Sequence, residues 1–310
     1  MKKSFIFASF VAMVAMLASC SKELPTPRFD YEAEGLVVTF INQSKNADTF
    51  AWDFGDGSAI SKEQAPVHEY AEAGTYSVKL TASNKDGEKT LTQEIVLTAL
   101  SVDITIDGDF SDWAEVPASL LAEAKVDENA VYEELYDIKF CTDADYIYFY
   151  MEYNGQEFEI DEEGSKNTIG VLDIFFNTDG KAETGFACWL WKDAGADILI
   201  EGGTEVSKED GKEYWNPEGF KSLEFGTAEW QWEGLDLGDG IKISDIKSIN
   251  GHKALEGSIM RATLGNPTSL SVGVLTQGAG WSGEFGSLPE MYIDAEGTSV
   301  AQELMEVKLN

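Results

Sequence analysis

Two tryptophans at alternate positions of one short segment have the most specific binding chemistry in this sequence. Trp189 and Trp191 lie in the stretch 186–191, where the alternation of residues with period two predicts a β-strand. Alternate side chains of a strand point to the same face, so the two indole rings should lie side by side. Flat rings on a rigid sheet stack well on a sugar ring or another flat ligand. The alternative is that the rings pack under a loop or against a second sheet, as most large aromatics do.

Further tryptophans and their polar neighbours extend this candidate site. Trp230 and Trp232 again alternate, Trp215 follows a tyrosine in a polar stretch predicted as a loop, and Trp281 lies in a glycine-rich loop. Glycine-rich backbone can approach a ligand closely. Polar groups beside stacked rings can orient sugar hydroxyls through hydrogen bonds. The polar candidates are Asn216, Gln231 and Glu284.

Three aspartates form a second candidate site, for a metal ion. Asp107, Asp109 and Asp112 have a spacing that suits the oxygen ligands of Ca²⁺. They do not complete an EF-hand loop, because its glycine and distal glutamate are out of place. A plain acidic turn is the favoured interpretation of this spacing. A structural calcium ion is the cofactor that these aspartates could hold instead.

The residues that most enzyme classes need are scarce. The chain has two histidines, His68 and His252, and it lacks a nucleophile elbow, a Cys–His motif and a phosphate loop. Most acid–base pairs that use histidine are therefore unavailable. Carboxylates are abundant, so residue types alone still permit a glycosidase pair. We predict that the protein is not an enzyme.

The elements that must position these residues are strands. In the region 102–310, the segments 171–176 and 198–201 alternate with period two, and 136–141 and 146–151 predict a hairpin around 142–145. No segment predicts a long helix. A β-sandwich of roughly ten strands fits this region. Within it, alternation marks strands with one buried face, and the other face is left for binding.

The region before it predicts a smaller β-sandwich. Candidate strands 36–41, 49–54, 76–83 and 91–97 follow one another with turn residues between them. The segments WDFGDGS, PVHEY, AGTYSVKLTASN and DG, in this order, closely resemble a PKD domain, an immunoglobulin-like sandwich, over residues 28–98. The resemblance implies a spacer or interaction role and a structural role for His68. Asp53 and Asp56 are predicted to tighten their turn rather than to bind calcium.

The second region also resembles a known group. The segments ITIDGDFSDW, DADYIYFYMEYNG, DIFFNTDGKAETGF and ALEGSIMRATLG resemble the DOMON-like group, which includes family-9 carbohydrate-binding modules. This resemblance implies a sandwich that binds glycan ends between aromatic rings, in some members with a structural calcium ion, and places Trp113 in the core. Some DOMON relatives bind haem through methionine and histidine. Met151 and His252 are that alternative pair, although Met151 is predicted in the core and His252 in a turn.

The charge of the chain limits its partners. Its 22 basic and 56 acidic residues give a net charge of −34. Such a surface repels phosphate backbones and anionic lipid headgroups, so we predict no nucleic-acid partner. Neutral ligands and cations remain compatible with it.

The N-terminus has the features of a secretory leader. Lys2 and Lys3 precede an apolar run, 5–17, and the sequence Leu-Ala-Ser-Cys ends at Cys20. This resembles a bacterial lipobox, which implies removal of residues 1–19, lipidation of Cys20 and a tether through residue 27. Ser21 after the cysteine argues against retention in an inner membrane, and nearby Glu23 suits surface export in the Bacteroidota. Two other cysteines, Cys141 and Cys188, are predicted as buried thiols, with a disulfide as the alternative.

Taken together, these features predict a non-catalytic lipoprotein of the outer membrane that faces the cell exterior. It would bind a glycan through the second sandwich, and the first sandwich would act as a spacer. Its expected partners are outer-membrane proteins of polysaccharide uptake or secretion, and the acyl chain is its only expected membrane contact. A structural or adhesive protein that binds a protein partner is the alternative.

Overall fold

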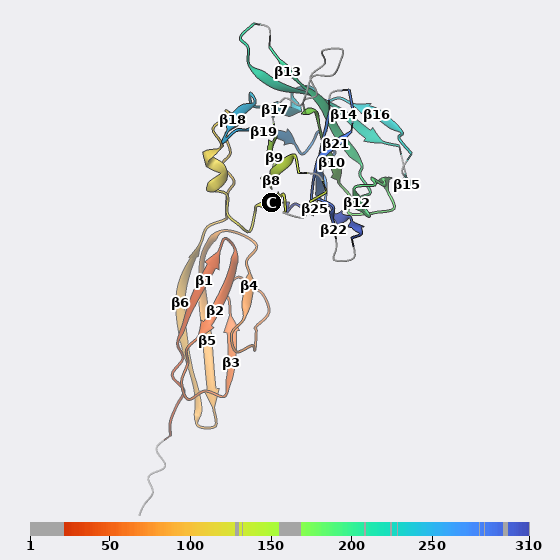
Figure 1. The fold of residues 1–310 in the computed structure, drawn as a ribbon. Coiled ribbons are helices and arrows are strands. Elements are labelled where there is room, and N and C mark those ends of the chain that lie inside the picture. The colour runs from red at the N-terminus through yellow and green to blue at the C-terminus, as the bar shows by residue number, and fades with distance from the viewer. Residues whose placement is uncertain are drawn as a thin grey trace, which may run out of the picture. The chain divides into compact units, whose positions relative to one another are not determined.

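A computed structural model of the chain describes residues 22–127, 130–131, 133–154, 169–207, 209–223, 225–227, 229–278, 280–281, 283–293 and 297–309. The chain divides between residues 100 and 101 into two compact units (Figure 1). The predicted leader and the predicted lipidation site, Cys20, lie outside the described residues. Among the helices that the structure describes, none is both long enough and apolar enough to cross a membrane.

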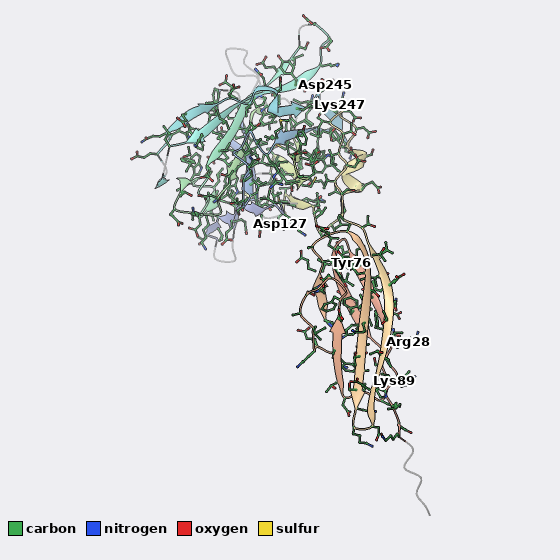
Figure 2. The ribbon with its side chains drawn as sticks, turned by 180° about the vertical axis from the view of Figure 1, so that it is seen from behind. Arg28, Tyr76, Lys89, Asp127, Asp245 and Lys247 are labelled. Carbon is green, nitrogen blue, oxygen red and sulfur yellow. The ribbon has the colours of Figure 1, made fainter. Side chains whose placement is uncertain are left out.

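The first unit is a sandwich of two three-stranded sheets. One sheet has the order β1–β2–β4 and the other β3–β5–β6, and all neighbours are antiparallel. The strands are β1 (Phe29–Glu34), β2 (Val37–Asn42), β3 (Thr49–Asp53), β4 (Val67–Glu69), β5 (Gly74–Asn84) and β6 (Gly87–Leu97). The predicted strands of this region are thus confirmed. Tyr76 of β5, labelled in Figure 2, donates a hydrogen bond to the Glu72 carbonyl over 2.8 Å.

Aromatic packing and one tight turn stabilise the first unit. Trp52 is fully buried, and its indole N–H donates to the Glu63 carbonyl over 3.1 Å. The His68 ring stacks on Phe54 with centroids 3.9 Å apart, and its Nε2 lies 2.7 Å from an Asp56 carboxylate oxygen. Burial alone would raise the pKa of Asp56, but hydrogen bonds from Ser58 and His68 bring it down to about 2. His68 and Asp56 therefore have the predicted structural roles.

The second unit is a larger β-sandwich of a seven-stranded and a six-stranded sheet, with short strand pairs around them, in the part that the structure describes. The seven-stranded sheet has the order β16–β14–β13–β10–β20–β21, and β25 also pairs with β20. Its strands are β10 (Ile169–Asn177), β13 (Ile198–Val206), β14 (Glu213–Ser222), β16 (Trp232–Leu235), β20 (Ser271–Gly278), β21 (Glu284–Leu288) and β25 (Met305–Glu306).

The six-stranded sheet has the order β17–β19–β9–β8–β7, and β18 also pairs with β19. Its strands are β7 (Ala122–Lys125), β8 (Leu135–Thr142), β9 (Tyr146–Tyr153), β17 (Ile241–Ile243), β18 (Lys247–Ile249) and β19 (His252–Met260). The short pairs are β11 (Gly185–Phe186) with β15 (Phe225–Thr227), β12 (Trp191–Lys192) with β24 (Gln302–Glu303), and β22 (Tyr292–Ile293) with β23 (Ser299–Val300). Two short 3₁₀ helices, η1 (Phe110–Ala114) and η2 (Gly238–Gly240), complete the described elements. The predicted hairpin around 142–145 is confirmed as β8 and β9.

The main core lies between the two large sheets. Leu172, Ile174 and Phe176 of β10 contact it, together with Met151 of β9, which is fully buried as predicted. The alternation predicted that the opposite face of β10 would be open to solvent. It is covered instead, because Val171, Asp173 and Phe175 are at most 3% exposed. In a central strand that is covered on both sides, side chains are buried at nearly every position. We call the side of the seven-stranded sheet that bears Asp173 and Phe175 its outer face.

The segment 185–196 covers much of this outer face, and it differs from the predicted strand. β11 ends at Phe186 and β12 begins only at Trp191, with a turn between them. Phe186, Cys188 and Trp191 are buried and pack with Phe175, while Trp189 points into solvent. The prediction that Trp189 and Trp191 share one face is therefore wrong, since it required an uninterrupted strand.

One buried carboxylate holds the chain where it enters the second unit. Glu256 of β19 has no exposed surface. One of its oxygens accepts the backbone N–H groups of Asp107 (3.1 Å) and Gly108 (2.8 Å). The other accepts the indole N–H of Trp113 (3.0 Å), which is buried as predicted. This fixes the opening segment against the six-stranded sheet.

Candidate functional site

Three tryptophans of the second unit are unusually exposed for such large apolar side chains. Trp189 and Trp230 are each 53% exposed, and Trp281 is 58% exposed. Trp189 comes from the turn between β11 and β12, Trp230 from the approach to β16, and Trp281 from the loop between β20 and β21. Trp189 and Trp230 contact Phe186, which packs on the outer face. Exposed aromatic rings that are held in place are typical of ligand-binding surfaces.

Two of the exposed rings belong to one aromatic cluster around Phe186. The Phe186 ring meets Trp230 at 5.1 Å and 87°, and Trp189 at 6.2 Å and 89°. Trp232, which is partly buried, lies 5.5 Å from Trp230 and 5.6 Å from Phe186. Edge-to-face contacts of this kind fix the orientation of each ring. We call Phe186, Trp189, Trp230 and Trp232 the aromatic platform.

Carboxylates orient the indole groups of Trp189 and Trp281. The Trp189 Nε1–H donates to Glu284 Oε1 over 2.7 Å. The Trp281 side chain hydrogen-bonds to the Glu201 carboxylate of β13. Trp281 itself has φ +59°, in the left-handed region that a bulky residue rarely adopts. Backbone strain of this kind is found preferentially at ligand sites, where the surrounding structure must enforce it.

A row of acidic residues crosses the outer face beneath these rings. Asp173 of β10 is paired with Glu201 of β13, which is paired with Glu218 of β14. Asp173 is only 1% exposed, and its Oδ1 has no hydrogen-bond partner. Burial raises the pKa of the Asp173 carboxyl well above its usual range, and the charge of Glu201 raises it further. We call Asp173, Glu201 and Glu218 the acidic row.

The acidic row is close to the covering segment and its rings. Burial raises the pKa of the Cys188 thiol to about 12, and the charges of Glu284 and Asp173 both contribute. Phe175, two residues after Asp173 on the same face of β10, stacks on Phe186 of the platform with ring centroids 6.3 Å apart. Burial also raises the pKa of Glu201. The hydrogen bond from Trp281 lowers this pKa, and the charge of Glu218 raises it. The acidic row thus adjoins the aromatic platform on β10 and Trp281 on β13.

Replacing Asp173 by asparagine is expected to stabilise the protein at pH 8. The folded state keeps the Asp173 proton to a higher pH than the unfolded chain does, so stability falls as the pH rises through this interval. An amide cannot ionise and can donate to Glu201. We expect Asp173→Asn to raise the free energy of unfolding by about 1–2 kcal/mol at pH 8 and to change it little at pH 4. Urea unfolding at the two pH values measures this, and a loss of stability at pH 8 would contradict it.

Two predicted site residues are core residues instead. Trp191 is 2% exposed and donates from Nε1 to the Pro289 carbonyl over 2.7 Å. Trp215 is 3% exposed, lies in β14 rather than in a loop, and donates to the Gly202 carbonyl over 2.8 Å. Their indole N–H groups are satisfied inside the protein, as buried tryptophans require. The prediction of open rings at these two positions is wrong.

The polar candidates lie at the surface. Gln231 is exposed beside Trp230 and donates to a Glu229 carboxylate oxygen over 2.8 Å. Asn216 is exposed on β14, and its Nδ2 donates to Glu205 Oε1 over 3.4 Å. Glu284 is the one of the three that bonds an exposed indole. Their contact with a ligand stays a prediction.

The aspartates predicted for calcium serve local backbone hydrogen bonds. Asp107 accepts from the Asp109 N–H at 2.8 Å, Asp109 from the Ser111 N–H at 3.2 Å, and Asp112 from the Thr105 N–H at 2.8 Å. Among the described residues, no group of three or more histidine, cysteine or acidic side chains is placed to hold a metal ion. The arrangement fits the acidic turn that was the favoured interpretation.

The predicted haem pair does not come together. Met151 is fully buried in the core between the sheets. His252 begins β19 rather than lying in a turn, stacks on Tyr136 at 3.9 Å, and places Nδ1 2.7 Å from a Glu152 oxygen. Cys141 and Cys188 are buried free thiols, in agreement with the favoured prediction.

The acidic row escaped sequence analysis. Asp173 is a single carboxylate inside an apolar strand, and that was a usable signal, because a buried charge without a partner is rare. Its pairing with Glu201 depends on strand register, which the sequence pattern alone did not give. Phe186 is buried, and its place at the centre of the platform depends on segments more than 40 residues apart.

Comparison with known proteins identifies one of the two units. Residues 29–99 match the family model of the PKD domain. The first unit is a PKD domain. Over 76 residues it is 38% identical to the pre-pro-metalloprotease PrtV of Vibrio cholerae, and over 71 residues 37% identical to a microbial collagenase of Vibrio alginolyticus. Each match covers 23% of this chain but only 8% and 9% of those proteins, so the chain spans less than a tenth of their length.

Solved PKD domains are among the structures to which part of this chain is similar. The PKD1 domain of the V. cholerae metalloprotease PrtV is 38% identical, with a TM-score of 0.24, and covers 25% of this chain and 100% of its own. The PKD1 domain of Vibrio anguillarum Epp is 32% identical, with a TM-score of 0.24, and covers 25% and 98%. A structure of carbohydrate-binding modules of the β-sandwich superfamily is 15% identical over 77% of this chain and 92% of its own, with a TM-score of 0.24. At that score the similarity carries no argument about function.

Proposed function

We propose that the outer face of the second unit binds carbohydrate. The observation that supports this best is the set of three exposed tryptophans, Trp189, Trp230 and Trp281, each fixed by a ring contact or a carboxylate. Rings that are already oriented lose little conformational freedom when a ligand binds. The apolar face of a sugar gains contact area on indole, and its hydroxyls find acceptors in the neighbouring carboxylates.

The rest of the chain suits a binding protein rather than an enzyme. In this proposal the PKD domain is a spacer, and a lipid on Cys20 holds the protein on the outer membrane, facing outward. Binding would deliver glycan to outer-membrane proteins of polysaccharide uptake or secretion. The high net negative charge keeps such a surface protein soluble and away from anionic lipid headgroups.

A glycan titration tests the proposal. The full chain without the leader is titrated with a broad panel of neutral and charged oligosaccharides while indole fluorescence is recorded. We expect saturable changes, because solvent-exposed tryptophans report on stacking directly. A flat response to every glycan, from protein with an intact thermal transition, would contradict the proposal.

A further inference from the structure

The acidic row carries an inference about which sugars bind, and it rests on the proposed function. We propose that the outer face selects glycans that carry free, protonated amino groups. The ammonium group would bind at Glu201, between the Trp281 ring and the other two carboxyls of the acidic row. Glu201 is only partly buried and accepts a hydrogen bond from Trp281. It is therefore the member of the row that a ligand can reach from the exposed ring.

The row has an excess of negative charge that the described protein does not balance. Asp173, Glu201 and Glu218 lie on three adjacent strands, and among the described residues no lysine or arginine forms an ion pair with any of them. Buried charges are normally paired or hydrogen-bonded, because an unpaired one is costly. Beside Glu201 on the paired strand β10, the Asp173 Oδ1 has no hydrogen-bond partner although the residue is only 1% exposed. A cation is the group that would complete this arrangement.

An aromatic ring beside carboxylates suits an ammonium group in particular. The face of an indole ring attracts a cation, by about 0.5–1 kcal/mol at exposed sites and about 2 kcal/mol or more when the cation is desolvated. An ammonium group also has three donors, which match carboxylate acceptors. A neutral hydroxyl brings no charge that would favour the ionised form of these carboxyls. A sulfated or carboxylated sugar would place a further negative charge beside them.

Binding of a cation must also release protons. The titratable groups that face Asp173 are Glu201, its partner on the neighbouring strand β13, and Cys188 of the covering segment. An ammonium group stabilises the ionised form of the two raised carboxyls, so bound protons leave as the ligand enters. A neutral sugar that stacks on the same rings would not cause this release.

The test compares two sugars that differ only at the amino group. Isothermal titration at pH 6 uses a glucosamine hexamer and the fully N-acetylated hexamer, each in two buffers of different ionisation enthalpy. We expect the glucosamine hexamer to bind at least 10-fold more tightly, with proton release, and to lose most of this preference in Glu201→Gln. Glu115→Gln, an exposed residue outside the site, removes the same charge and should keep the preference. Asp173→Asn should also weaken the preference for the glucosamine hexamer. This variant provides the test if Glu201→Gln fails to fold.

The possible outcomes separate the two proposals. Equal or tighter binding of the N-acetylated hexamer would overturn the selection of amino sugars and leave carbohydrate binding intact. Failure of both hexamers and of all neutral glycans would overturn carbohydrate binding as well. A lysine hexamer that binds as tightly as the glucosamine hexamer, with equal loss in both variants, would show plain attraction of a polycation and overturn the inference.

Discussion

Glycan affinity is expected to fall about 100-fold or more when Trp189 and Trp281 are both replaced by alanine. Each exposed ring offers an oriented apolar surface, and aromatic residues at the centre of a binding site commonly contribute about 2 kcal/mol or more. Even about 1.4 kcal/mol from each ring gives the factor of 100. The change removes surface rings rather than core packing, so the thermal transition should move little. Titration calorimetry with the tightest ligand of the panel measures the loss.

The matched control is an apolar residue on the other sheet. Met260 of β19 is 38% exposed and lies away from the aromatic platform in the fold. Met260→Ala should leave the affinity within a factor of two. If the double variant binds as the wild type does, or if Met260→Ala weakens binding as strongly, then the exposed tryptophans are not the binding surface.

Replacing Glu256 by alanine is expected to destabilise the second unit by about 3–5 kcal/mol. The change removes the acceptor of three donors, namely the partly buried backbone N–H groups of Asp107 and Gly108 and the buried indole N–H of Trp113. Seven of the eight tryptophans lie beyond residue 100, so indole fluorescence during urea unfolding follows this unit. Glu256→Gln keeps an oxygen for the two backbone donors and should cost less than the alanine variant.

Glu115→Ala provides the comparison for this effect. Glu115 follows η1 in the same opening segment, but its side chain is exposed. Its loss should change the free energy of unfolding by about 0.5 kcal/mol or less. Equal effects of the two alanine variants would mean that the Glu256 hydrogen bonds do not anchor the segment.

Strands were predictable from this sequence because alternation is a local signal. The strands of the PKD domain and the β8–β9 hairpin lie where the pattern placed them. The pattern failed where the chain turns, between β11 and β12. Gly185 has φ +71°, and a Cβ there would meet the Ala196 backbone at 2.5 Å, so a close approach of two segments interrupts the strand. Trp189 is therefore exposed and Trp191 is buried two residues later.

The binding surface was only partly predictable, because its composition depends on which segments meet. Exposed Trp189, Trp230 and Trp281 were all candidates from sequence, and buried Trp191 and Trp215 could not be separated from them. An aromatic residue in an alternating segment has the same local pattern whether its face meets solvent or a covering loop. The acidic row requires the register between β10, β13 and β14, which no single segment encodes.

The most direct test of the central claim uses the indole N–H groups as internal reporters. The chain has eight tryptophans, and a two-dimensional ¹H–¹⁵N spectrum resolves one indole signal for each. On addition of a binding glycan, the signals of Trp189, Trp230 and Trp281 should move together. The signals of the buried tryptophans should stay, and these are Trp52, Trp113, Trp191 and Trp215. Shifts confined to the buried set, or spread evenly over all eight signals, would contradict binding at the outer face.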